Sequence, residues 1–251
     1  MGSRPDDWEA HWREYADAAA RNPAQAYRRQ LVLKLLAETA PVRRLFDIGA
    51  GTGDLAFAVR RAFPEAEIRG TDVSESGLAV ARAKVPDATF FQRDLLERKE
   101  PEPEQRNWAT HAVCSEVLEH VTDPAGLLRE GKKYLAPGCS LIVTVPGGPM
   151  SAFDRHIGHR RHFSSADLRE VLEQAGFAVE QVWAAGFPFF NVYRLLVILR
   201  GERLADDVAG GVESRLARVT MDAFSLLFRL NLDTSPWGWQ VLGVATRALH
   251  I

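Results

Sequence analysis

The feature that most constrains this chain is a turn that carries three glycines at alternate positions, Gly49, Gly51 and Gly53. An apolar run ends at Ile48 just before the turn, and an amphipathic helical pattern begins just after it. A strand, a tight turn and a helix in this order are typical of a nucleotide-binding turn. Glycine permits positive φ and removes the Cβ that would obstruct a ligand approaching the backbone.

The spacing of these glycines indicates which ligand to expect. The pattern G-x-G-x-G, with Asp47 two residues before the first glycine, differs from the dinucleotide fingerprint G-x-G-x-x-G. A nicotinamide oxidoreductase is therefore disfavoured. The turn also lacks the Lys-Ser or Lys-Thr pair that holds a phosphate, so a phosphate-binding loop is not predicted. A glycine-rich turn that only closes a strand–helix unit is the alternative.

Two later strands also end in an acidic residue. Residues 67–72 are predicted to form a strand that ends at Asp72, about 20 residues beyond the glycines, where a ribose-binding carboxylate belongs. A further strand over residues 89–95 carries Asp94 near its end. Each acid also has a simpler explanation, as a helix cap for Asp72 and as a solvated strand end for Asp94.

Taken together, this D-x-G-x-G-x-G turn and the two acids resemble the class I S-adenosylmethionine-dependent methyltransferases, over roughly residues 24–185 and 237–248. The resemblance implies that Asp94 accepts a hydrogen bond from the exocyclic amine of adenine, beside the backbone of Leu95. The methyl-donor site that it implies comprises Asp47, Gly49, Gly51, Gly53, Asp72, Val73, Asp94, Leu95 and Ser115.

Alternating helical and strand patterns predict an α/β fold, with a doubly wound, seven-stranded, mostly parallel sheet of Rossmann-like type. The resemblance implies that the last strand inserts antiparallel beside the fifth. One helix is expected to run from Pro124 to about Leu135, stopped by Pro137-Gly138, with a strand from Cys139 to Val145. We expect a single domain, divided into N-terminal cap helices over 1–40, a donor-binding core over 41–185, a helical insertion or lid over 186–238, and the last strand within 239–251.

The bulk composition sets limits on partners and location. The formal net charge of -2 provides no basic surface of the kind that nucleic-acid binding requires. The polar, charged segment from Met1 to Glu14 does not resemble a signal peptide, and no apolar run is long enough for a membrane span. Cys114 and Cys139 lie in apolar strands and are predicted to be buried free thiols, which indicates a cytoplasmic location.

A metal site is one hypothesis for the acceptor side. Glu116, Glu119 and His120 follow the fourth strand at spacings that place them on one face of a helical turn. The stretch is similar to that of the ubiquinone-type O-methyltransferases and the small-RNA 2′-O-methyltransferases. That resemblance implies a divalent ion (Mg, Mn, Fe or Zn), with His159 or, less well placed, His162 as a further ligand. The alternative is that the acids only shape the turn, without a metal.

A second hypothesis concerns the histidine-rich loop before the helix that starts near Ser165. His156, His159 and His162 are candidates for a general base, because a neutral imidazole can accept a proton from a hydroxyl group. The neighbouring arginines could bind a carboxylate or phosphate of the acceptor. A simple surface turn, ordered by hydrogen bonds of the histidines, is the alternative.

The insertion over 186–238 is more apolar than a surface hairpin requires. Its interpretations are a lid for an apolar acceptor, a homodimer face, shallow membrane contact, or extra core packed on the N-terminal helices. The segment Asp206–Gly211 between its two helical patterns is predicted to be a mobile link.

We therefore expect an S-adenosylmethionine-dependent methyltransferase that acts on a small or medium-sized acceptor, apolar or lipid-linked, at an oxygen atom. N- or C-methylation from the same donor site is one alternative. A non-catalytic module that only binds S-adenosylmethionine is another.

Overall fold

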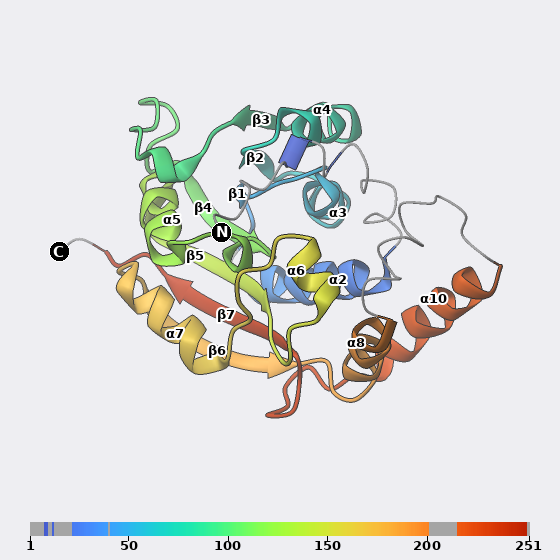
Figure 1. Ribbon diagram of the computed structural model, residues 1–251. Helices are drawn as coiled ribbons and strands as arrows, with labels where there is room; N and C mark the ends of the chain where they lie inside the picture. Colours follow the sequence, from blue (N-terminus) through green and yellow to red (C-terminus); the bar gives the residue numbers. More distant parts are fainter. Residues whose placement is uncertain (1–7, 10–11, 13–21, 40, 201–214, 250–251) are drawn as a thin grey trace.

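The computed structural model describes residues 8–9, 12, 22–39, 41–200 and 215–249, and its core is a seven-stranded sheet (Figure 1). The strand order is β3-β2-β1-β4-β5-β7-β6, and β7 runs antiparallel to both β5 and β6. The predicted fold class and the position of the last strand are therefore confirmed. The strands are β1 (Arg44–Ile48), β2 (Glu67–Asp72), β3 (Thr89–Gln92), β4 (Ala109–Ser115), β5 (Leu135–Pro146), β6 (Ala178–Ala185) and β7 (Gln240–Thr246).

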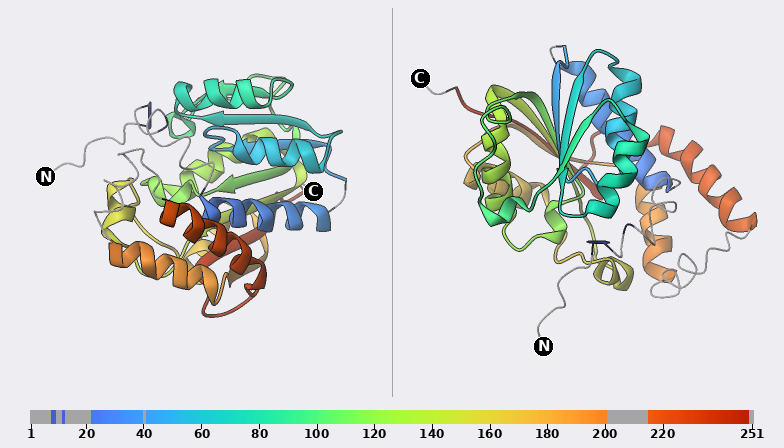
Figure 2. Two further views of the ribbon diagram at one scale, coloured as in Figure 1. Left: turned by 90° about the vertical axis from the view of Figure 1, so that its right-hand side faces the viewer. Right: turned by 90° about the horizontal axis from the view of Figure 1, so that it is seen from above.

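Helices cover both faces of the sheet, which Figure 2 shows in the view from above. One face carries α2 (Pro23–Glu38), α3 (Asp54–Ala62) and α4 (Glu75–Lys84), and the other carries α5 (Pro124–Gly131) and α7 (Ser165–Gln174). Because both faces are covered, the central strands are apolar along almost their whole length. Cys114 and Cys139 are buried free thiols, as predicted.

The helices begin where the sequence supplies caps. The Asn22 side chain accepts a hydrogen bond from the Ala24 amide, and Pro23 occupies the first turn of α2. At the start of α7, Ser164 and Asp167 form the predicted capping box. These local signals define the ends of the helices that border the site described below.

The boundary between α5 and β5 differs from the prediction. The helix ends at Gly131, a short 3₁₀ turn η3 (Lys132–Tyr134) follows, and β5 begins at Leu135 rather than at Cys139. Leu135 pairs with Ala109 and Ser140 pairs with His111, so residues 136–139 bulge out opposite a single residue of β4. Proline is tolerated there because a bulge needs no ladder donor, and Gly138 adopts a φ of 78°.

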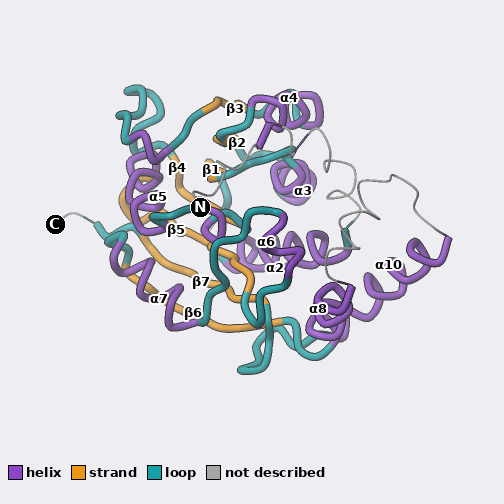
Figure 3. Tube along the Cα trace, viewed as in Figure 1, coloured by secondary structure: helices purple, strands orange, loops and turns teal. Residues whose placement is uncertain are grey.

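The insertion packs as additional core beside α2. It contains α8 (Phe189–Arg200), α10 (Arg215–Leu227) and the 3₁₀ turn η4 (Phe228–Leu230), and Figure 3 shows α8 and α10 next to α2. Aromatic side chains join these elements, with Tyr27 of α2 5.6 Å from Phe190 and 5.5 Å from Phe228, measured between ring centroids. Among the helices that the structure describes, none combines the length and apolar character needed to cross a bilayer.

Three short elements follow strands of the sheet. The 3₁₀ turn η1 (Leu95–Glu97) comes after β3, the 3₁₀ turn η2 (Leu118–His120) comes after β4, and the helix α6 (Ala152–His156) comes after β5. Each of them therefore places side chains at the carboxyl end of a parallel strand.

Two predictions concern segments that lie largely outside the described residues. The predicted link over Asp206–Gly211 is one of them. The other is the N-terminal cap helix, of which only Trp8, Glu9 and Trp12 are described.

The bulge in β5 generates a prediction about stability. Gly138→Ala should lower the free energy of unfolding by about 1 kcal/mol, because an L-residue is disfavoured at positive φ. Gly138→Asn should lower it less, since asparagine tolerates the left-handed region. Urea unfolding of the three proteins would measure this. Equal stability of all three would contradict the bulge geometry.

Candidate active site

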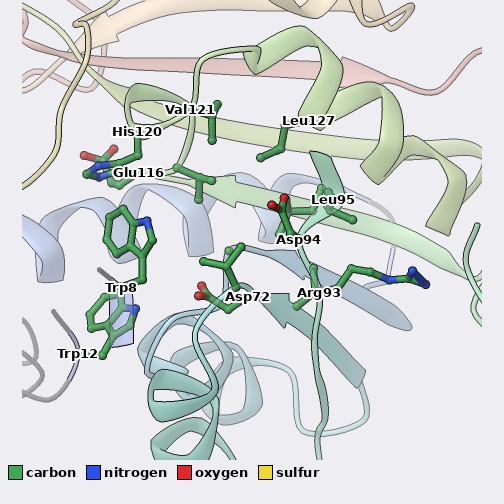
Figure 4. Close-up of a pocket in the computed structure, with 15 residues that line it drawn as sticks. Trp8, Trp12, Asp72, Arg93, Asp94, Leu95, Glu116, His120, Val121 and Leu127 are labelled. Carbon is green, nitrogen blue, oxygen red and sulfur yellow. The ribbon is translucent and has the colours of Figure 1, made fainter. Parts of the chain in front are cut away.

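A pocket lies at the carboxyl ends of β1, β2 and β4, the edge where ligands bind in doubly wound folds (Figure 4). Figure 4 shows Asp72 and Asp94 reaching it from neighbouring strand ends, with Trp8 and Trp12 beside it and the Arg93 side chain directed away. The lining residues are Trp8, Trp12, Ile48, Gly49, Thr71, Asp72, Val73, Arg93, Asp94, Leu95, Glu116, Val117, His120, Val121 and Leu127.

The glycine turn leaves no room for side chains. Gly49, Gly51 and Gly53 have φ of 79°, 50° and 72°. A Cβ on Gly49 would lie 2.3 Å from a methyl carbon of Val117, and one on Gly51 would lie 2.7 Å from the Trp12 ring. Gly49 lines the pocket, whereas Gly51 and Gly53 support the turn beneath it. The turn is thus a cradle that any Cβ would disturb.

The Asp72 carboxylate is held in place by backbone donors. Its Oδ2 accepts from the Gly51 amide and its Oδ1 from the Ser74 amide, both at 2.9 Å. Burial raises the pKa of this carboxyl, which the amide bonds partly offset. A carboxylate has about four lone-pair directions, so these amides do not use all of its accepting capacity. Asp94 is fixed in a similar way, because its Oδ1 accepts from the Leu96 amide at 2.8 Å.

Asp47 and Ser115 lie behind the pocket wall. Asp47 is buried, and its Oδ2 has no hydrogen-bond donor among the described residues. Burial, reinforced by the charge of Asp72, raises the pKa of Asp47 to about 7. The Ser115 hydroxyl lies 2.8 Å from the hydroxyl of Thr144. Of the predicted donor-site residues, Gly49, Asp72, Val73, Asp94 and Leu95 line the pocket, and Asp47, Gly51, Gly53 and Ser115 do not.

A largely buried ion pair lies between this pocket and the insertion. Arg28 of α2 places its Nε 2.9 Å from Glu116 Oε2 and 2.7 Å from Gln240 Oε1. The other oxygen of Glu116 accepts from Gln240 at 2.9 Å and from Thr144 at 3.0 Å. Glu116 itself has a φ of 58°. It is therefore not on one helical face with Glu119 and His120, and that part of the sequence prediction is wrong.

Three histidines form a continuous row from the pocket wall inward. The His120 ring, which lines the pocket, has its centroid 4.6 Å from Trp8 and 4.7 Å from His159. His159 Nδ1 lies 3.2 Å from His162 Nε2, and His162 Nδ1 lies 3.0 Å from the Gly148 carbonyl oxygen. We name His120, His159 and His162 the imidazole cluster.

The hydrogen bonds of the imidazole cluster assign its tautomers. A carbonyl only accepts, so Nδ1 of His162 carries a proton and Nε2 of neutral His162 accepts from His159. Nε2 of His159 is then unprotonated. Burial, followed by the charge of His120, lowers the pKa of His159, and burial also lowers the pKa of His162. Both rings are therefore neutral near pH 7.

Glu119 lies beside the imidazole cluster and is fully buried. Neither of its carboxylate oxygens has a hydrogen-bond donor among the described residues. Burial, followed by the charge of Glu116, raises the pKa of Glu119 well above its usual range. One ligand atom from each of Glu119, His120 and His159 lies within 4.8 Å of the other two. A buried carboxylate without donors is a suitable ligand for a divalent cation, and the mixed set fits Mg, Mn, Fe or Zn.

An ion pair under the imidazole cluster was not predicted from the sequence. Asp154 of α6 accepts from Arg194 of α8 through both oxygens, at 3.0 and 2.7 Å, and both side chains are buried. Burial disfavours the charged form of Asp154, but Arg194 outweighs this and lowers the pKa of its carboxyl. Asp154 also lies 3.7 Å from His162 Nε2. His156, by contrast, is exposed and does not join the cluster.

The sequence did not predict the roles of Arg28, Trp8 and Trp12. Arg28 pairs with Glu116, and both tryptophans line the pocket. No local pattern distinguishes these residues, because their partners are far away in the chain.

Comparison with known proteins adds independent findings. The family model described as a methyltransferase domain matches residues 15–182. A Mycolicibacterium smegmatis protein classed with the S-adenosylmethionine-dependent methyltransferases is 27% identical over 231 residues, covering 86% of this chain and 75% of that protein. The ubiquinone biosynthesis O-methyltransferase of Marinobacter nauticus is 25% identical over 172 residues, covering 61% of this chain and 71% of its own length.

A solved structure shares the fold. Phosphoethanolamine N-methyltransferase 2 of Haemonchus contortus, in complex with S-adenosyl-L-methionine, superposes with a TM-score of 0.57 at 20% identity, covering 88% of this chain and 52% of that one. At this identity the likeness shows the fold alone, and the family assignment comes from the domain match. The chain therefore belongs to the methyltransferase domain family, and it is an S-adenosylmethionine-dependent methyltransferase.

Proposed function

We propose that this enzyme methylates an oxygen atom of a small or medium-sized acceptor, and that the imidazole cluster accepts the acceptor's proton. The observation that carries the proposal is a row of partly buried imidazoles that begins with His120 at the wall of the pocket. A relative at 25% identity is a ubiquinone biosynthesis O-methyltransferase, which also supports oxygen as the methylated atom.

The proposed role of the donor pocket is to bind and orient S-adenosylmethionine. The Gly49 turn would let the ligand approach the backbone, Asp72 would offer its remaining lone pairs to the ribose hydroxyls, and Asp94 would accept from the adenine amine. When bound, S-adenosylmethionine would supply a methyl group whose carbon–sulfur bond breaks as the carbon–oxygen bond to the acceptor forms. Alignment and exclusion of water therefore provide most of the catalysis.

The proposed role of the imidazole cluster is to accept the proton of the acceptor hydroxyl group. A hydroxyl group that forms a bond to carbon must lose its proton, and a neutral imidazole is suited to accept it. His159 has an unprotonated Nε2 because Nδ1 is committed to His162, which is itself held by the Gly148 carbonyl. An amine or carbon acceptor remains the alternative.

A divalent cation at Glu119, His120 and His159 is a second candidate for activating the acceptor. The donorless oxygens of Glu119 favour it. When bound there, the ion would lower the pKa of an acceptor hydroxyl. Glu116, which the resemblance includes among the ligands, is committed to Arg28, Thr144 and Gln240 and is left out of this proposed site.

The donor assignment predicts the effect of one substitution. Asp72→Asn should weaken S-adenosylmethionine binding on the order of 10- to 100-fold, because charge-assisted hydrogen bonds to the ribose are lost. Isothermal titration calorimetry would measure it, with Asp222→Asn on the remote helix α10 as the control. Unchanged affinity in Asp72→Asn would remove this carboxylate from the donor site.

The imidazole cluster predicts a separation of binding from turnover. His159→Gln should reduce kcat at least about 100-fold with donor affinity unchanged, because proton transfer is lost. His156→Gln, at an exposed position, serves as the matched control. Methyl transfer to a set of phenols and matched anilines, followed by mass spectrometry, provides the assay. Transfer to the anilines alone would overturn the oxygen assignment.

The cation hypothesis predicts that Glu119, and not Glu116, is needed for metal binding. Calorimetry with Mn²⁺ or Zn²⁺ on chelator-treated protein should show one site, lost in Glu119→Gln and retained in Glu116→Gln, since Glu119 has oxygens without donors and Glu116 does not. Metal content of the purified protein gives a second readout. Identical metal binding by the parent and Glu119→Gln would exclude this site.

A further inference from the structure

A second cavity, of about 580 Å³, lies at the same edge of the sheet, beyond the imidazole cluster. Its walls come from the end of β6, the loop before β7 and the starts of α7 and α8. Four of its lining residues are aromatic, and none is charged. We name it the aromatic cavity; the residues that the argument uses are Gly148, Phe163, Phe187, Asn191, Trp237 and Trp239.

The walls of the aromatic cavity are held by hydrogen bonds. The Asn191 amide donates to the Trp237 carbonyl at 2.6 Å and accepts from the Trp239 amide at 3.1 Å, so both tryptophans are tied to α8. The Trp237 ring has its centroid 5.4 Å from that of Phe187. A Cβ on Gly148 would lie 2.6 Å from the Trp239 ring. The rings therefore have defined places.

One ring remains open to solvent despite this order. Trp237 is 65% exposed, although its backbone is fixed by Asn191 and its ring contacts Phe187. An indole gains most by burying its apolar face, and aromatic pairs prefer offset or edge-to-face contacts. A planar ligand in the cavity would pack against Trp237 and Phe187 and bury the exposed face of the indole.

The aromatic cavity adjoins the imidazole cluster through shared residues. Gly148 lines the cavity, and its carbonyl accepts from His162. Phe163 follows His162 directly in the chain. Asn191 and Arg194 are three residues apart on α8 and hence on one face, with Asn191 holding the cavity wall and Arg194 holding Asp154 beneath the histidines. The imidazole cluster and the aromatic cavity are therefore neighbours that share Gly148.

We propose that the aromatic cavity binds an uncharged aromatic ring system, the part of the acceptor that determines specificity. The inference rests on the proposed function only in identifying this ring system as part of the acceptor, because the cavity's affinity for such rings is a property of its walls. A charged group would lose water there without gaining a counterion, which disfavours anionic or cationic rings. The size of the cavity is within the range of small-molecule sites.

The test uses 2-naphthol as an uncharged probe and naphthalene-2-sulfonate as its anionic counterpart. Saturation-transfer NMR and calorimetry should show binding of 2-naphthol and much weaker binding of the sulfonate. Trp237→Ala and Phe187→Ala should each weaken 2-naphthol binding about tenfold, since each removes one stacking wall. Leu199→Ala, at a position 80% exposed on α8, is the matched control. Thermal unfolding checks that each variant is folded.

The outcomes separate this proposal from the donor site. Asp72→Asn should retain 2-naphthol binding, so loss of donor binding with intact naphthol binding leaves the cavity proposal standing. Naphthol affinity equal in the parent, Trp237→Ala and Phe187→Ala would overturn it. So would equal affinity for the sulfonate. A dimer seen by light scattering that Trp237→Ala abolishes, with no naphthol binding, would assign the rings to a second copy of the chain and also overturn it.

Discussion

The buried ion pair of Arg28 and Glu116 is the interaction on which the arrangement at the active edge of the sheet depends. Charges removed from water are tolerated only where their hydrogen-bonding groups are satisfied. Gln240 and Thr144 complete that requirement for Glu116. The partners come from α2, the end of β4, β5 and β7, so one network joins Arg28 to a residue 212 positions away. It also holds Glu116 in the left-handed conformation that turns the chain toward Glu119 and His120.

The donor pocket and the imidazole cluster differ in charge. The donor pocket carries the carboxylates of Asp72 and Asp94, which suit a cationic sulfonium ligand. In the imidazole cluster beyond it, His159 and His162 are neutral, because burial lowers the pKa of each ring. In the proposed reaction a positive charge is lost from the donor pocket as one appears on the cluster. Neutral imidazoles before the transfer avoid repulsion between two cations, which a protonated cluster would suffer.

The convergence of the proposed donor-binding residues could be predicted because they lie at strand–helix junctions. Parallel strands bring their carboxyl ends to one edge, so Gly49, Asp72 and Asp94 converge whatever the loops do. The start of β5 could not be predicted from the sequence. Pro137-Gly138 usually stops a helix, and only the pairing with β4 makes this segment a bulge. The prediction that Glu116 shares a helical face with Glu119 and His120 was wrong for a related reason. Its spacing matched a helical face, but the distant Arg28 determines where its carboxylate lies.

The acceptor half depends on contacts between distant segments, which no short pattern reveals. The aromatic cavity takes its walls from β6, α7, α8 and the loop before β7, and each piece alone would be interpreted as ordinary packing. The same contacts bear on whether the insertion is a lid. Its first helix supplies Arg194, and moving that helix away would leave Asp154 buried without its partner. Breaking such a pair costs about 3–5 kcal/mol, so α8 should stay in place as a wall of the proposed acceptor site.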